Sequence, residues 1–327
     1  MKKSQLPATE FSQYAKCLML SNGDLFQAKS IAEEHCTSNR VPSVIKAAIA
    51  AGSTNDPTWA GNVFDARFIA EAFAASLVGV SAFDTIAADS RRAPLATRVG
   101  ATISAGFGNV TAEGAPMPVT QMGFAATTLA PRRITALCAV TQELLRGPFA
   151  EQFLDEEMAN AVAVAQDTAF VTTITTGASS SASAGTGSAN ALKDIRTLLD
   201  KVNAPGAVPY LILGSTNANA LATSDGTPFA KCTPTGGEVA GVPYVVSSAA
   251  PTKAVAVDAR SLLTGDDVIV LESSKQATLE MSSTPAGGDA VQVALWQANL
   301  VGLLASRRIG YQVIRSAGVA VVTGAAW

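Results

Sequence analysis

The stretch "GPFAEQFLDEEMANAVAVAQDTAFVTTI", residues 147–174, predicts a single long helix. Pro148 suits a first helical turn, because the N–H that proline lacks would have no partner there. Apolar side chains recur along it at helical spacing: Phe149, Phe153 or Leu154, Met158, Ala161, Val162, Ala165 and Ala169. At a rise of 1.5 Å per residue, about 26 residues span roughly 39 Å, which is longer than a typical globular helix.

Carboxylates gather in the first half of this predicted helix, at Glu151, Asp155, Glu156 and Glu157. Such a cluster raises the question of a metal or acid–base site. Negative charge is also favourable near the N-terminus of a helix, because the helix dipole is positive there. We interpret the cluster as a solvated face that complements the dipole.

Upstream of the helix, residues 97–135 predict an arm of two strands. The segments 97–110 and 121–135 are rich in Thr, Val, Ile and Phe, which favour strands. Between them lies "TAEGAPMPVT", residues 111–120, which carries Gly114, Pro116 and Pro118. Proline lacks the backbone donor and fixes its own φ, so this stretch is neither a helix nor a central strand. It therefore predicts a stiff tip that joins the two strands.

The composition indicates a large core under a surface with few charges. Of 327 residues, 48% are hydrophobic and only 15% are charged, against about a quarter in typical domains. A low-charge surface fits a close oligomer, in which other copies cover it, or an ordinary enzyme rich in small residues. The net charge of −3 argues against a dedicated nucleic-acid binder.

The N-terminus and the cysteines point to no membrane or secretory role. The chain holds no run of about 18 apolar residues, so we expect no transmembrane helix. "MKKSQLPATEFSQYAK" has no apolar core of the secretory kind, so we expect no signal peptide. The cysteines, at 17, 36, 138 and 232, are far apart in sequence and form no CxxC pair. We expect four reduced thiols in a cytosolic product.

No catalytic, cofactor-binding or metal-ligating constellation stands out. His35 is the one histidine, and the sequence contains no G-x-S-x-G and no P-loop motif. Zinc would need more nitrogen or sulfur ligands at close spacing. The stretch "GFGNVT" lacks the third glycine of a dinucleotide-binding loop. The sequence therefore gives no support to an enzyme.

The first 51 residues predict three helices, at 10–20, 24–36 and 42–51. Three short helices could form a DNA-reading helix-turn-helix. Residues 1–46, however, carry six Lys or Arg against four Asp or Glu, which is too balanced for a phosphate-binding face. After a flexible connector expected at 177–190, strands and helices alternate, and the chain is extended again from 291 to 324.

The order of these features resembles one family, the major capsid proteins of tailed bacteriophages with the Hong Kong 97 fold. In that family a hairpin arm, the E-loop, precedes a long spine helix in a peripheral (P) domain. An α/β axial (A) domain follows, and the chain then returns to the P-domain. The segments that carry the resemblance are "AEGAPMPVTQMGFAATTLAPRRITALCAVTQELL" (112–145), "AQDTAF" (165–170), "GGEVAGVPYVVSS" (236–248), "ALWQANLVGLLASRRIGY" (294–311) and "VAVVTGAAW" (319–327).

The resemblance implies an α+β fold with the parts that the family has. In sequence order we expect an N-terminal helical segment and arm (1–60), the start of the P-domain (61–96), the E-loop hairpin (97–135), the spine helix and connector (136–188), the A-domain (189–289) and the P-domain return strands (290–327).

The function that the resemblance implies is structural. Copies of the chain would assemble into hexamers and pentamers of an icosahedral phage head that encloses double-stranded DNA, bound without sequence specificity. Assembly would occur in the host cytoplasm, and the partners could include portal, scaffold, head protease or decoration proteins. No cofactor is implied. An encapsulin-like compartment that encloses cargo proteins is the alternative within the same fold, and a soluble enzyme or a DNA-binding N-terminus is the alternative outside it.

The arm supplies the candidate contacts between subunits: Arg98, Glu113, Pro116, Pro118, Arg132 and Arg133. Arg98 and Glu113 are the sole charged residues in the sequence of 97–131, and such a low charge fits a segment that a neighbouring subunit covers. Arg132 and Arg133 could pair with carboxylates of 151–157 on a neighbouring spine helix, or could be solvated surface arginines. Some family members cross-link an E-loop lysine to asparagine, but this chain has no lysine between Ala47 and Leu192. We therefore expect a shell without covalent links.

Overall fold

The computed structural model describes residues 6–21, 24–36, 41–42, 45, 81–104, 123–146, 150–202, 204, 206–267, 269–282 and 292–327. The chain divides into two compact units. Unit 1 comprises Met1–Val80, Arg133–Ala165 and Val268–Arg308, and unit 2 comprises Ser81–Arg132, Gln166–Asp267 and Ile309–Trp327. Each unit is thus built from three separate parts of the chain, and each is described by itself.

A seven-stranded sheet forms the centre of unit 2. In sheet order its strands are β5 (Ser179–Ala182), β16 (Val319–Thr323), β10 (Lys253–Asp258), β6 (Pro209–Leu213), β9 (Val242–Val246), β8 (Gly236–Val239) and β7 (Cys232–Thr233). The central strand β10 runs antiparallel to both of its neighbours, whereas β6 and β9 are parallel. The middle of β10, Ala254 to Val257, is apolar and buried, as is typical of a strand in the interior of a sheet.

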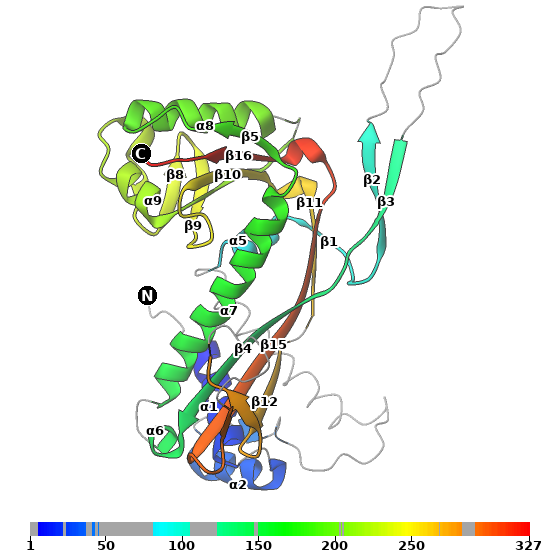
Figure 1. Cartoon of the computed structure of the whole chain (residues 1–327), viewed down its shortest axis with the longest axis vertical. Coiled ribbons are helices and arrows are strands. Elements are labelled where there is room, and N and C mark those ends of the chain that lie inside the picture. The colour runs from blue at the N-terminus through cyan, green and yellow to red at the C-terminus, as the bar shows by residue number, and fades with distance from the viewer. Residues whose placement is uncertain are drawn as a thin grey trace, which may run out of the picture. The chain divides into compact units, whose positions relative to one another are not determined.

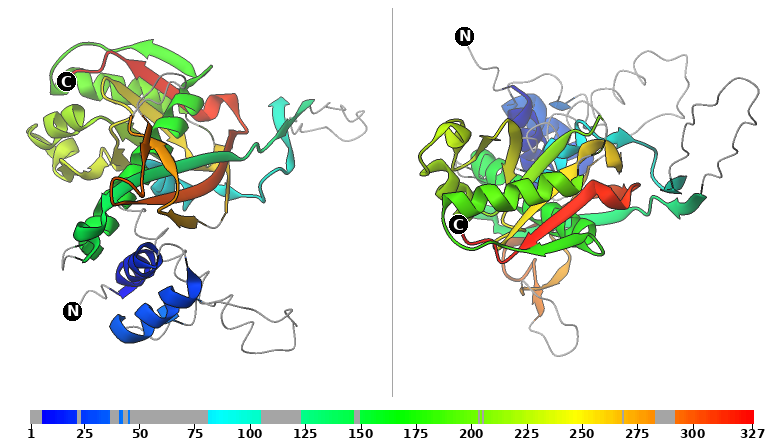
Figure 2. Two further views of the ribbon diagram at one scale, coloured as in Figure 1. Left: turned by 60° about the horizontal axis from the view of Figure 1, so that its bottom comes forward. Right: turned by 90° about the horizontal axis from the view of Figure 1, so that it is seen from above.

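Two helices pack against this sheet. α8 (Ser188–Val202) and α9 (Ser215–Ala222) follow β5 and β6 in the chain, and α8 lies along the sheet in the right-hand view of Figure 2. The buried face of α8 carries Ile195 and Leu198, which join Leu211 and Leu213 of β6 in one core cluster. Apolar residues at helical spacing in α8 and a continuous apolar run in β6 produce this packing.

A second set of elements in unit 2 surrounds the start of the arm. α5 (Ala82–Ala87) is followed by β1 (Arg91–Arg92), which pairs in parallel with β11 (Leu262–Asp266). β11 in turn pairs antiparallel with the Ile309–Val313 end of β15 (Leu300–Val313). Short 3-10 turns at Thr227–Phe229, Ala259–Ser261 and Ser316–Gly318 complete the unit.

Unit 1 contains the N-terminal helices and the other part of the β15 sheet. α1 (Leu6–Leu20) and α2 (Leu25–His35) pack on each other, and Asp24 caps α2 by accepting from the Phe26 N–H. α1 also contacts α6 (Gln142–Arg146) and β12 (Val270–Ser274). β12 pairs antiparallel with β15, and β4 (Arg132–Thr141) pairs with β15 too. A small hairpin joins β13 (Thr278–Glu280) to β14 (Gln292–Ala294).

The predicted long helix is confirmed as α7 (Ala150–Thr175), which has 26 residues (Figure 1). The predicted helices 10–20 and 24–36 are confirmed as α1 and α2, while most of 42–51 lies outside the described residues. The α+β class is confirmed as well, since both units contain helices and strands and most of the strand pairings are antiparallel.

The expectation of a structureless connector at 177–190 is wrong in part, because Ser179–Ala182 forms β5. Serine and alanine have little strand preference, but β5 pairs in parallel with β16, whose Ala320–Val322 core is buried. The backbone of β16 would otherwise have an unpaired edge, so tertiary pairing overrides local propensity here. The terminal strand β16 lies in the seven-stranded sheet of unit 2, away in sequence from the strands that it joins.

A proline at Ala161 tests the long helix. The exposed Ala161 side chain lies in the helix interior, where proline removes a backbone hydrogen bond and clashes with the preceding turn. We expect Ala161→Pro to destabilise the chain by about 3 kcal/mol, measured by thermal unfolding followed by circular dichroism. The matched control Ala161→Gln keeps the helix and should change stability by less than about 0.5 kcal/mol. Equal stability of the two variants would contradict the assignment.

Candidate assembly site at the base of the arm

The described part of the arm is a two-stranded antiparallel sheet of its own. β2 (Arg98–Ser104) pairs with β3 (Gly123–Thr128), from Arg98 opposite Thr128 to Ser104 opposite Gly123 (Figure 1). The register shifts between Thr102 and Ser104, as at a β-bulge. The predicted hairpin is therefore confirmed in its paired strands, and the last residues of 97–135, from Arg132 on, belong to β4.

Main-chain hydrogen bonds close the hairpin at its base. The Leu129 N–H donates to the Thr97 carbonyl at 3.0 Å, and the Ala96 N–H donates to the Leu129 carbonyl at 3.0 Å. Ala96 adopts a φ of 63°, which is uncommon for a residue with a side chain. The Thr97 hydroxyl adds a bond to the Pro94 carbonyl at 2.7 Å. The chain thus turns sharply into the arm at a point fixed by several bonds.

Two facing glycines form the seat on which this base rests. Gly265 of β11 lies opposite Gly310 of β15 in the antiparallel register. A Cβ added at Gly265 would come within 2.7 Å of the Ala93 carbonyl oxygen and 2.9 Å of the side chains of Leu95 and Leu129. A Cβ at Gly310 would meet the Leu95 side chain at 2.7 Å. Only the lack of side chains here lets both leucines lie directly on the sheet.

An aromatic cluster stands beside this seat. The rings of Phe83, Phe170 and Tyr311 lie in contact, with centroids 5.2 to 5.8 Å apart and mostly edge-to-face. The guanidinium of Arg132, the first residue of β4, lies 5.1 Å from the centre of the Tyr311 ring. Arg132 therefore has a partner within its own chain, which sequence reasoning did not identify.

The carboxylate of Asp167, on the C-terminal half of α7, is buried and accepts four hydrogen bonds. Oδ1 accepts from the Ser81 hydroxyl at 2.6 Å and the Phe83 N–H at 3.1 Å. Oδ2 accepts from the Ala82 N–H at 2.9 Å and the Ser247 hydroxyl at 2.9 Å. Asp167 thus binds the N-terminal amides of α5 and, through Ser247, the end of β9.

Gln166 extends this network on the same helix. Its amide Nε2 donates to the Ser81 hydroxyl and to Oδ2 of Asp84, both at 2.5 Å. Ser81 is also the N-cap of α5, accepting from the Asp84 N–H at 3.4 Å. All of these groups are nine-tenths or more buried, so their bonds lie away from competing water. The network fixes α5, and hence the chain that leads to the arm, against α7.

The six candidate contact residues are placed only in part. The side chains of Arg98, Arg132 and Arg133 are exposed. Glu113, Pro116 and Pro118 lie outside the described residues. Among the predicted partner carboxylates of 151–157, Glu157 is exposed and the other side chains are not described. Pairing of Arg132 or Arg133 with a neighbouring spine helix therefore stays a prediction.

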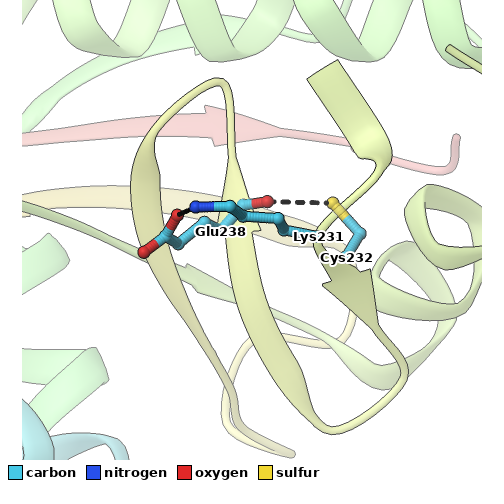
Figure 3. A network of polar contacts seen from close by, with 3 residues as sticks. All are labelled: Lys231, Cys232 and Glu238. Atoms are coloured by element: carbon cyan, nitrogen blue, oxygen red, sulfur yellow. Dashed lines mark hydrogen bonds and ion pairs between the residues drawn. The ribbon is translucent and has the colours of Figure 1, made fainter. Parts of the chain in front are cut away.

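A second polar network lies on the β7–β8 hairpin of unit 2 (Figure 3). The Lys231 ammonium pairs with the Glu238 carboxylate at 2.7 Å, and the Cys232 thiol donates to the Glu238 carbonyl at 3.4 Å. The Tyr244 hydroxyl donates to the Thr233 carbonyl at 2.6 Å, and burial is the main cause that raises the pKa of Tyr244 to about 12. Tyr244 therefore remains a neutral donor, and the network serves to hold a short hairpin.

Within the described ranges, no group of three or more His, Cys, Asp or Glu side chains is arranged to hold a metal ion. In that same part of the chain no helix is long and apolar enough to cross a membrane.

Comparisons with known proteins agree with this arrangement. A sequence profile described as the phage capsid family matches residues 75–324. The capsid polyprotein of Pseudomonas phage PAJU2 is 30% identical over 366 aligned residues, which cover 98% of this chain. They cover 54% of that relative, so the chain spans about half the length of the polyprotein that it matches.

Two solved structures share the fold at low sequence identity. A chain of Gordonia phage Cozz aligns with a TM-score of 0.50 and 15% identity, over 73% of this chain and 85% of that one. A virus-like particle from Pyrococcus furiosus aligns with a TM-score of 0.50 and 13% identity, over 76% of this chain and 96% of the other.

The fold is therefore of the Hong Kong 97 class. The chain belongs to the phage capsid family, as its sequence predicted.

A side chain added at Gly265 tests whether the facing glycines hold the base of the arm. We expect Gly265→Ala to destabilise unit 2 by about 1–3 kcal/mol, because the new methyl group meets the backbone oxygen of Ala93. Gly302→Ala is the matched control, since it adds the same methyl to β15 against the flexible end of Leu295 at 3.1 Å. Calorimetric unfolding of both variants provides the measurement, and a larger loss for Gly302→Ala would refute the seat.

Proposed function

We propose that this chain is the major structural subunit of a phage head. Copies assemble into hexamers and pentamers of a closed icosahedral shell that encloses double-stranded DNA. Membership of the phage capsid family supports the shell role, and the fold supports the manner of assembly. The single observation that carries the proposal is the hairpin β2–β3, a two-stranded sheet of its own on a fixed base in unit 2.

In this proposal α7 is the spine helix, and β2 and β3 with the tip between them are the E-loop. The A-domain is the seven-stranded sheet with α8 and α9, so it extends the range 189–289 expected from the sequence by β5 and by β16. The arm lies over a neighbouring copy, and the prolines of its tip lower the entropy cost of holding that shape. They also protect an exposed strand edge from wrong pairing.

Exposed apolar side chains support covering by other copies. Among the described residues, the large apolar side chains that are most exposed all belong to unit 1: Phe26, Leu137, Leu144, Val164, Val270, Met281 and Trp296. Trp296 is 75% exposed, and a tryptophan in water forfeits the free energy of burying its ring. Association with further copies would recover that free energy, repeated at each symmetric contact.

The packaged DNA is held without sequence readout in this proposal. With a net charge of −3, the chain has no excess of positive charge to bind the DNA phosphates tightly. Confinement by the shell would therefore retain the genome. Portal, scaffold, head protease and decoration proteins are the further partners that a head of this kind would need, and assembly would take place in the host cytoplasm.

An encapsulin-like compartment is the second candidate, because the same fold serves it. The two differ in what the particle contains, so the content of purified particles separates them. Particles that hold nuclease-resistant double-stranded DNA support the phage head. Particles that hold a stoichiometric cargo protein and no DNA would support the compartment.

Shortening the arm tests the role proposed for its tip. Replacing residues 105–122 by Asn-Gly leaves β2 and β3 joined by a tight hairpin turn. We expect this variant to keep the circular dichroism spectrum of the parent chain but to form no closed shells in electron micrographs. A full-length control with Thr111→Ser and Thr120→Ser keeps the number of residues in the tip and all six candidate contact residues, and it should still assemble. Normal shells from the shortened arm would contradict the proposal.

A denaturing gel tests the expectation of a non-covalent shell. The stretch between Ala47 and Leu192 contains no lysine, so an arm lysine cannot form an isopeptide bond there. Particles boiled with or without reductant should give one band at the monomer mass, 33.3 kDa. A ladder of multimers that survives reductant would show covalent links and refute the expectation.

A further inference from the structure

Two cysteines that are far apart in sequence meet in the N-terminal helix pair. The sulfur atoms of Cys17, in α1, and Cys36, at the C-terminal cap of α2, lie 3.5 Å apart. Both are thiols in this structure. The four cysteines are far apart in sequence, but these two are neighbours in the fold. The reason is that α1 and α2 fold back on each other and bring positions 19 residues apart together.

The surroundings of the pair hold it in place. Cys17 is 3% exposed and belongs to a small apolar core with Leu18, Ala28 and Ala32, whereas Cys36 is half-buried at its edge. The adjoining ends of the two helices are bonded as well: the Ser21 N–H donates to the Cys17 carbonyl and the Asp24 N–H to the Ser21 carbonyl. These bonds and the packed core keep the two thiols in contact, and Cys36 is partly open to solvent.

We propose that Cys17 and Cys36 are a reversible dithiol site that closes to an intrachain disulfide when a small disulfide oxidant, such as glutathione disulfide, is present. From 3.5 Å the two sulfur atoms need to approach by about 1.5 Å to reach the bond length of about 2.05 Å. In a reducing cell the pair stays as thiols, and it closes in an oxidising medium outside.

Thiol–disulfide exchange between the protein and glutathione disulfide takes two steps. The more exposed Cys36, as its thiolate, attacks one sulfur of glutathione disulfide, which forms a mixed disulfide and releases one glutathione thiolate. The Cys17 thiolate then attacks the Cys36 sulfur and releases the second glutathione. The two protein thiols are oxidised to one disulfide and the oxidant is reduced to two glutathione thiols. The protons lost by the cysteines are taken up by the two leaving thiolates.

The bond would tie α2 to an element that is already anchored in unit 1. α1 contacts α6 and β12, and the Ser273 hydroxyl donates to the Leu18 carbonyl at 3.1 Å. A crosslink from residue 17 to residue 36 restricts the unfolded chain, so it favours the folded helix pair. The site would therefore fasten the N-terminal segment once the protein leaves a reducing compartment. It joins residues of one chain, so the band on a denaturing gel stays at the monomer mass.

Peptide mapping after oxidation tests the proposal directly. The purified full-length chain is incubated with glutathione disulfide, denatured with N-ethylmaleimide, and digested with trypsin. Cleavage after Lys16, Lys29 and Arg40 places the two cysteines in separate peptides, CLMLSNGDLFQAK and SIAEEHCTSNR. We expect these peptides to be joined, and the intact chain to take up two maleimides in place of four. Dithiothreitol should restore four.

Matched variants assign the bond to this pair. Cys36→Ser should show no joined peptide, with all three of its remaining cysteines labelled after oxidation. Cys138→Ser, which removes a thiol elsewhere, should still form the bond and label at Cys232 alone. Four labelled cysteines in the oxidised parent chain would overturn the proposal. So would a disulfide that involves Cys138 or Cys232, or one found only between different chains.

Discussion

One buried carboxylate organises unit 2. Asp167 accepts four hydrogen bonds, from two backbone amides of the α5 start and from the hydroxyls of Ser81 and Ser247. A buried charge is costly unless such donors surround it, and here both of its oxygens are bonded twice. Because the donors come from two separate parts of the chain, the start of α5 and the end of β9, the carboxylate holds both of them against α7.

The arm depends on that arrangement. α5 leads through β1 to Leu95, which lies with Leu129 on the glycines of β11 and β15. Phe83, the second residue of α5, packs its ring on Phe170 of α7 and on Tyr311, over which Arg132 lies. The same short helix thus connects the buried charge to both sides of the hairpin base.

Elements that depend on neighbouring residues could be predicted from the sequence. Contacts between residues far apart in the sequence could not. α7 was predictable because a proline before it, carboxylates in its first half and apolar residues at helical spacing all indicate a helix, although Ala161 of the predicted stripe is exposed. The order of arm, helix and α/β region identified the family. No local signal links Asp167 to Ser81 and Ser247, which lie 86 and 80 positions away. β5 and the Cys17–Cys36 contact were missed for the same reason, since tertiary neighbours create both. The glycine seat is visible only when the register of β11 and β15 is known.

Replacing Asp167 by asparagine tests the organising role of its carboxylate most directly. An amide keeps the size but turns one acceptor into a donor, which then faces the N–H of Ala82 or Phe83. We expect Asp167→Asn to lower the free energy of unfolding by roughly 2 kcal/mol or more in calorimetry. Asp200→Asn is the control, because that exposed carboxylate only pairs with Arg196 at 3.9 Å, and its loss should cost less than about 0.5 kcal/mol. If both variants unfold at the temperature of the parent chain, the carboxylate does not hold unit 2 together.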